Sequence, residues 1–240
     1  RWLVKRRDST GGSGVRDAEP GLRVDGHTAV LQAAIAGEPV AGLYLAGGRT
    51  ARLLGVTSQL LCGTGPGPGP YGYRGSLGPH AVPAQERAQW EAIGATLAAT
   101  FALRGLFGVD AIRAGGRIVV VEVNPRWTAA AEVLEHAGAG ALVVAHLAAC
   151  RGDPPVVTPA ATAVVHGKAY VFAPRDLRAP PADRLVAAVE GEAADVPAPG
   201  SVVPAGAPLV TVFASAATRS VCEALLDART QAAVAACDTA

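Results

Sequence analysis

The chain has 240 residues, half of them hydrophobic, which is enough for one large or two modest domains with a sizeable core. Its net charge of +1 argues against a nucleic-acid or anionic-membrane partner. The four cysteines lie far apart without a CxxC spacing, which argues against a structural zinc site and favours free thiols in a reducing compartment. No apolar run reaches membrane-spanning length and no signal peptide is recognisable, so we expect a cytoplasmic protein.

The start of the sequence has an unusual feature. The chain contains no methionine and begins at Arg1, inside an expected strand. Because a reading frame ordinarily begins with Met, we interpret the sequence as a fragment or as a chain processed at its N-terminus.

Residues 1–5 are expected to form a strand that runs into a polar loop with glycines at positions 11, 12 and 14. Backbone N–H groups in such a loop can surround phosphate oxygens, and the missing side chains permit close approach. The spacing matches neither a P-loop nor a Rossmann fingerprint. Taken alone, a loop of this composition is more often a linker than a ligand site.

The next segments favour strands and a Gly/Pro loop. Two strands joined at Gly47-Gly48 are expected within residues 40–61, followed by a loop over residues 62–70. Residues 71–75 keep the composition of a loop. Arg74 within them is a candidate to bind a substrate carboxylate, and a solvated Arg is the alternative.

Two helices are expected around the middle of the chain. An apolar stripe at helical spacing predicts a helix over residues 83–103, with Trp90 and Phe101 in the core. A second helix is expected over residues 128–150, where His136 and His146 have no paired ligand at metal spacing and are interpreted as structural.

Between these helices, residues 108–126 read GVDAIRAGGRIVVVEVNPR and predict a β-hairpin around two glycines. Asp110 lies on the outgoing strand, while Glu122 and Asn124 share one face of the returning strand. Carboxylate and amide oxygens suit a hard cation such as Mg²⁺, which completes its shell with phosphate oxygens. Arg126 follows on the same face, where a guanidinium can hold an anion. A polar surface hairpin is the alternative, but it explains less well a carboxylate within the apolar run of residues 118–123.

The sequence Glu-Val-Asn-Pro-Arg at 122–126, with an acidic residue 12 positions upstream, resembles the metal-binding end of the ATP-grasp superfamily. That superfamily includes biotin carboxylase, D-alanine–D-alanine ligase and many carboxylate–amine ligases. The resemblance implies an α+β ATP-grasp fold with Mg²⁺ (or Mn²⁺) held by Asp110, Glu122 and Asn124. It also implies that Arg126 is the catalytic residue that helps to bind the phosphorylated substrate.

The same resemblance assigns an ATP site to the first forty residues. Lys5 matches the lid lysine that contacts the nucleotide, and Gly11, Gly12 and Gly14 match the loop over the phosphates. Gln32, Ala34 and Ile35 match the hinge that binds adenine, and Glu38 matches the ribose contact. Many family members have an acidic and an aromatic residue where this chain has Gln32 and Ala33-Ala34, so we expect looser adenine packing. For Glu38, a solvent-exposed turn is the alternative.

The resemblance divides the chain into a partial lid subdomain (1–34), a large subdomain with the metal site (35–152) and a β-rich C-terminal module (153–240). Residues 151–155 mark the second boundary. Strands are expected within 161–172 and 200–214, and the second of these segments has the short strands and turns of a barrel-sandwich module. An amphipathic helix is expected over 218–236. The hairpin segment contains no lysine, which excludes a biotinyl or lipoyl carrier. Lys168 is expected to be exposed on its strand, and a position facing the active site is the alternative.

The activity implied is an ATP-dependent ligation in which a carboxylate is activated as an acylphosphate and joined to an amine or similar nucleophile. Family members carry a domain and a first lid lysine before the lid, and we expect both upstream of Arg1. The alternatives are a non-catalytic nucleotide- or metal-binding remnant that acts through a partner, and a β-rich interaction module. A homodimer of this chain is compatible with the sequence. Residues 122–134 also resemble uncharacterised ATP-grasp proteins found with one-carbon (methanopterin or methylofuran) genes.

Overall fold

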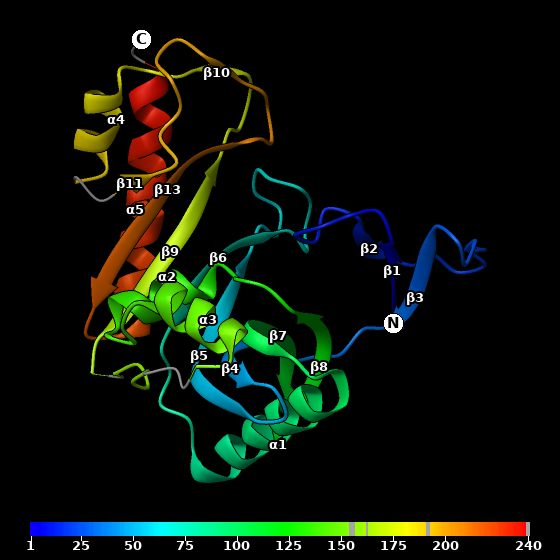
Figure 1. Ribbon diagram of the computed structural model, residues 1–240. Helices are drawn as coiled ribbons and strands as arrows, with labels where there is room; N and C mark the ends of the chain where they lie inside the picture. The colour runs from blue at the N-terminus through cyan, green and yellow to red at the C-terminus, as the bar shows by residue number, and fades with distance from the viewer. Residues whose placement is uncertain (154–156, 162, 191–192, 239–240) are drawn as a thin grey trace.

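The computed structural model describes residues 1–153, 157–161, 163–190 and 193–238, and it contains a small sheet beside a large one (Figure 1). The small sheet is antiparallel with the order β2-β1-β3. Its strands are β1 (Trp2–Arg6), β2 (Val15–Asp17) and β3 (Ala29–Ala33). The strand expected at residues 1–5 is confirmed.

The large sheet has the order β11-β13-β9-β6-β5-β4-β7-β8, and its neighbouring strands are antiparallel. Its strands are β4 (Glu38–Gly47), β5 (Ala51–Leu61), β6 (Tyr73–Gly78), β7 (Arg104–Ala114), β8 (Arg117–Asn124), β9 (Val165–Phe172), β11 (Ala193–Ala194) and β13 (Pro208–Ala216). The two strands expected within 40–61 are confirmed. The loop expected over 71–75 is wrong, because β6 begins at Tyr73 and pairs with both β5 and β9.

The C-terminal third contributes to the same sheet. β9 pairs with β6, and β13 pairs with β9, so these strands extend the large sheet. Within the described residues they do not form a separate barrel-sandwich. A two-stranded sheet of β10 (Leu177–Arg178) and β12 (Val202–Val203) lies beyond them. Of the predicted boundary, Pro154 and Pro155 lie outside the described residues.

Two long helices cover one face of the large sheet, called here the α1–α5 face. α1 (Ala84–Phe101) buries Trp90 against Tyr44, whose hydroxyl donates to the Trp90 carbonyl oxygen at 2.8 Å. Phe101, in contrast, is 64% exposed, so its predicted place in the core is wrong. It is the last residue of the helix, which ends at Ala102 in a left-handed backbone conformation with a φ of 50°.

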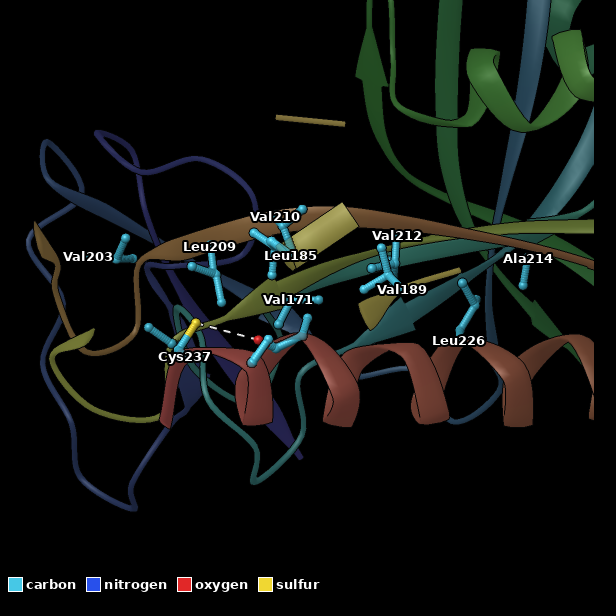
Figure 2. Packing of buried hydrophobic residues seen from close by; sticks show 14 of the residues in the cluster. Val171, Leu185, Val189, Val203, Leu209, Val210, Val212, Ala214, Leu226 and Cys237 are labelled. Carbon is cyan, nitrogen blue, oxygen red and sulfur yellow. Dashed lines mark hydrogen bonds between the residues drawn. The ribbon is translucent and has the colours of Figure 1, made fainter. Parts of the chain in front are cut away.

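α5 (Arg219–Asp238) confirms the predicted amphipathic helix. Together with α4 (Ala182–Ala188) it packs on β9 and β13 through aliphatic side chains such as Leu185, Val212 and Leu226 (Figure 2). Burial of this kind contributes about 25 cal/mol per Å² of apolar surface and holds the C-terminal strands to the sheet. No helix among the described residues is long and apolar enough to cross a membrane.

The opposite face, called here the α2–α3 face, carries two shorter helices. α2 (Ala130–His136) and α3 (Leu142–Arg151) replace the single helix expected over 128–150. The expected helix is interrupted at Gly138 and Gly140. Both glycines have a φ of 84°, a backbone conformation that glycine adopts easily. His146 Nδ1 accepts the Leu106 N–H at 2.9 Å, in line with its predicted structural role.

Candidate active site

The candidate site is built on the hairpin of β7 and β8. Ala114 opposes Arg117 across the Gly115-Gly116 turn, and the strands stay in step until Ala111 opposes Val120. The register then shifts by one residue, so that Asp110 opposes Glu122. Without this β-bulge Glu122 would oppose Val109, a core residue of the α1–α5 face. The bulge therefore places both carboxylates on the same face.

Hydrogen bonds tie the predicted metal ligands together. Asp110 Oδ2 accepts from Asn124 Nδ2 at 3.1 Å, and Asp110 Oδ1 accepts from Gln59 Nε2 at 2.8 Å. Arg126 Nη2 in turn donates to Asn124 Oδ1 at 3.0 Å. The structure thus brings together Asp110, Glu122, Asn124 and Arg126, which the sequence singled out.

The electrostatics of this cluster fit a cation. Burial of Asp110, and then the charge of Glu122, raise the pKa of the Asp110 carboxyl to about 6, although Asn124 and Gln59 donate hydrogen bonds to it. A divalent cation would offset both unfavourable effects and would meet oxygen ligands only. The described residues hold no group of three or more His, Cys, Asp or Glu side chains suited to a metal. A site here therefore has to combine the two carboxylates with the Asn124 amide.

The cluster continues across the α2–α3 face as a row of polar side chains. Asp110 opposes Ala41, which in turn opposes Thr57, two residues before Gln59. Since residues two apart on a strand share a face, Gln59 lies beside Asp110, as their hydrogen bond shows. Continuing across β6, β9 and β13, the directly opposed residues are Gln59, Ser76, Lys168 and Phe213.

Lys168 corrects the prediction of an exposed strand lysine. It is only 3% exposed and pairs with Glu132 of α2. Its ammonium lies 5.0 Å from the Tyr170 ring centroid and 6.0 Å from that of Phe213, which are cation–π distances. The sequence signal was a lone cation among apolar strand residues, but the helix that covers it could not be placed from the sequence.

The predicted nucleotide loop touches the large sheet. The Tyr73 N–H donates to the Gly11 carbonyl oxygen at 2.9 Å, which connects the loop of residues 7–14 to β6. A Cβ at Gly12, where φ is 80°, would overlap the Tyr71 carbonyl oxygen, so only glycine fits this approach. The loop thus contacts the start of β6 and the two residues before it.

The remaining lid residues lie in or beside the small sheet. Lys5 is a half-buried residue of β1 opposite Val15 and Val30. Gln32 opposes Leu3, and the Ala34 N–H donates to the Arg1 carbonyl oxygen at 3.0 Å. Ile35 follows in the connection to β4. Ala34 and Ile35 thus lie at the junction between the two sheets, whereas Lys5 and Gln32 lie within the small sheet.

Glu38 does not join the Asp110 cluster. It opposes Arg113 at the start of β4, three residues before Ala41, and therefore lies on the α1–α5 face. Its carboxylate accepts from Ser58 Oγ at 2.6 Å, from Arg113 Nη1 at 2.6 Å and from Arg219 of α5. A ribose contact would require it to leave these partners.

Arg74 also lies apart from the cluster. The register shift between Leu60 and Leu61 makes Arg74 the extra residue of a bulge in β6. Both terminal nitrogens of its guanidinium donate to Asp227 Oδ1 of α5, at 2.9 and 3.0 Å. A β-bulge re-aims a side chain, and here it directs Arg74 toward the helix on the opposite face.

A family model described as an ATP-grasp domain matches residues 1–130, more than half of the chain. The chain belongs to the ATP-grasp family. None of the curated proteins matches it. The solved structures do, and the ATP-grasp fold predicted from the sequence is confirmed.

Three of these structures show how far the similarity extends. They are phosphoribosylamine–glycine ligase from Thermotoga maritima (TM-score 0.64, 15% identity), carboxyaminoimidazole ribonucleotide synthase from Aspergillus clavatus complexed with ATP (0.64, 15%) and L-amino acid ligase from Bacillus licheniformis (0.67, 16%). The alignments cover 96%, 97% and 96% of this chain, and 65%, 62% and 61% of the three structures in turn. The ATP-grasp chain thus spans less than two thirds of their length.

Proposed function

We propose that this ATP-grasp chain binds ATP with Mg²⁺ and uses it to activate a substrate carboxylate as an acylphosphate, which an amine or similar nucleophile then attacks. The observation that carries the proposal is the opposed pair Asp110 and Glu122, with Asn124 hydrogen-bonded to Asp110. Two of the similar structures are named as ligases, and the third is complexed with ATP, which supports the same chemistry.

The residues present fit a magnesium ion. Asp110, Glu122 and Asn124 would hold Mg²⁺ (or Mn²⁺), which when bound neutralises charge on phosphate oxygens. Arg126 extends from the end of β8 and is positioned by Asn124 Oδ1, so its guanidinium can bind the phosphorylated substrate. Such fixed donors supply most of what phosphoryl transfer requires, namely positioning and charge stabilisation.

We assign the nucleotide to the junction of the two sheets. Backbone N–H groups at Gly11, Gly12 and Gly14 would bind phosphate oxygens together with Lys5. The connection at Gln32, Ala34 and Ile35 would bind the adenine edge. The substrates would be a small-molecule carboxylate, which takes the phosphoryl group, and a small-molecule amine, which attacks the acylphosphate. The resemblance to ATP-grasp proteins found with one-carbon genes stays a prediction.

Titration calorimetry with a non-hydrolysable ATP analogue tests the proposal. We expect binding at least about tenfold tighter with Mg²⁺ than without it. Glu122→Gln keeps the size of an exposed side chain but removes its charge, and it should weaken the Mg²⁺-dependent binding by about tenfold or more. Glu91→Gln, on the exposed surface of α1, is the matched control and should bind as the wild type does. Equal binding by wild type and Glu122→Gln would remove the metal assignment.

Catalysis is measured separately from binding. ADP release in the presence of mixed carboxylates and amines should depend on Asp110 and Arg126. Binding without ADP release would retain the nucleotide site but refute the ligase reaction for this chain.

A further inference from the structure

A cavity of about 440 Å³ lies between the loop after β5, strand β9 and helix α5. Its walls are mainly apolar, with Tyr170 and Phe172 from β9 and Val234 from α5. The volume lies within the range of small-molecule sites in proteins. Neither the metal cluster nor the junction of the two sheets contributes a residue to its walls.

Two buried polar atoms of the cavity walls have no hydrogen-bond partner among the described residues. They are Arg74 Nε and Thr230 Oγ1. The terminal nitrogens of Arg74 are held by Asp227, so the guanidinium is fixed while its Nε–H remains available. Buried donors in native proteins are nearly always paired, and an unpaired one costs about 1–3 kcal/mol. The two atoms therefore each lack a partner that a ligand in the cavity would supply.

The charges of the side chains that line the cavity indicate which kind of hydrogen-bond acceptor a ligand would carry. The positive charge of Arg74 is balanced by Asp227. Cys62, also in the wall, is a buried free thiol, and burial raises its pKa, so it stays neutral at pH 7. The cavity thus offers hydrogen-bond donors without surplus positive charge, and a carboxylate would lose hydration without gaining a counter-charge.

We propose that this cavity is a second binding site, which takes a small neutral molecule with a planar apolar body and a carbonyl oxygen. The oxygen accepts from Arg74 Nε–H and the Thr230 hydroxyl, and the body packs against Tyr170, Phe172 and Val234. None of the proposed metal or nucleotide ligands lines the cavity, so binding there can be tested separately from the proposed nucleotide chemistry.

Ligand-observed NMR titration of three probes tests the inference. Acetophenone has the neutral carbonyl, benzoate has a charged acceptor, and ethylbenzene has the apolar body alone. We expect acetophenone to bind about tenfold more tightly than either of the others. Equal affinity for the three probes, or no binding up to their solubility limits, would overturn the proposal.

Two variants locate the binding. Thr230→Val keeps the shape of the side chain but removes the hydroxyl, so it should weaken acetophenone binding three- to tenfold and leave ethylbenzene unchanged. Thr96→Val, at an exposed position of α1, is the matched control. Ala235→Phe, at an exposed position on the rim, should exclude all three probes without disturbing the core.

The outcome is independent of the nucleotide site. Glu122→Gln should bind acetophenone as the wild type does, even where it loses Mg²⁺-dependent nucleotide binding. Unchanged acetophenone binding by Thr230→Val and Ala235→Phe would show that the probe binds elsewhere and would refute this site.

Discussion

Replacing Glu38 with Gln tests whether this carboxylate stabilises the fold or contacts a nucleotide. Glu38 of β4 accepts hydrogen bonds from Ser58 of β5, Arg113 of β7 and Arg219 of α5. Arg113 also pairs with Glu86 of α1. The carboxylate therefore joins three strands and one helix directly, and a second helix through Arg113.

The pKa of Glu38 gives the size of the effect. Burial alone would raise it, but the hydrogen bonds from Ser58, Arg219 and Arg113 outweigh burial and lower it from 4.5 to about 2. By linkage, a difference of this size corresponds to about 3.4 kcal/mol of stability. Because 30% of the side chain is exposed, water screens part of the interaction, and we expect about 1–2 kcal/mol. Arg113 keeps Glu86 as a partner in the variant, so no buried charge is left alone.

The contribution has a defined pH dependence. Since the pKa is lower in the folded than in the unfolded protein, the stabilisation is complete above pH 4.5 and is lost as the pH falls toward 2. Urea unfolding of wild type and Glu38→Gln should therefore differ by about 1–2 kcal/mol at pH 7 and by less than about half of that at pH 3. Glu91→Gln should match the wild type at both pH values.

Nucleotide binding separates the two roles of Glu38. With the carboxylate engaged on the α1–α5 face, Glu38→Gln should bind the ATP analogue within about twofold of wild type. An unchanged free energy of unfolding together with a loss of nucleotide affinity would refute the structural role and support the ribose contact.

Three further predictions concern the core, the ion pair of the buried Lys168 and the glycine loop. Trp90→Ala should cost about 3–5 kcal/mol in urea unfolding, whereas Phe101→Ser should change stability by less than about 0.5 kcal/mol, and equal losses would contradict their different burial. Glu132→Gln leaves the buried Lys168 cation without its partner, and because Glu132 is 40% exposed and water screens the pair, it should cost about 1–3 kcal/mol; adding Lys168→Met should restore at least half, and an additive loss would contradict this. Gly12→Ala should break the contact between the loop and β6, seen as faster hydrogen exchange of the Tyr73 amide, and unchanged exchange would contradict the close approach.

The hairpin was predictable because its signals are local. Two glycines flanked by β-branched residues predict a turn between strands, and residues two apart on a strand share a face. The sequence separation of 12 between Asp110 and Glu122 predicted their approach, but a strand pair that stays in step from the Gly115-Gly116 turn would oppose Asp110 to Val121. The bulge that corrects the register has no distinct signal in a run of valines.

The faces of the other site residues could not be read from the sequence. Glu38 and Arg74 were assigned by position along the chain, yet strand pairing places both toward α1 or α5. Lys168 was expected to be exposed because its cover, Glu132 of α2, is 36 positions away. The joining of β9 to β6 is likewise a long-range pairing that local propensity does not encode.

Two one-residue irregularities thus decide which chemistry each face of the sheet carries. The bulge in β8 adds Glu122 to the face of Asp110, and the bulge in β6 removes Arg74 from that face. Because side chains alternate with a period of two, the opposite choice at either bulge would exchange a carboxylate or a cation between the two faces. The metal cluster would then have a single carboxylate, and the cavity beside α5 would lose its fixed donor. The two proposed sites therefore depend on strand register as well as on residue identity.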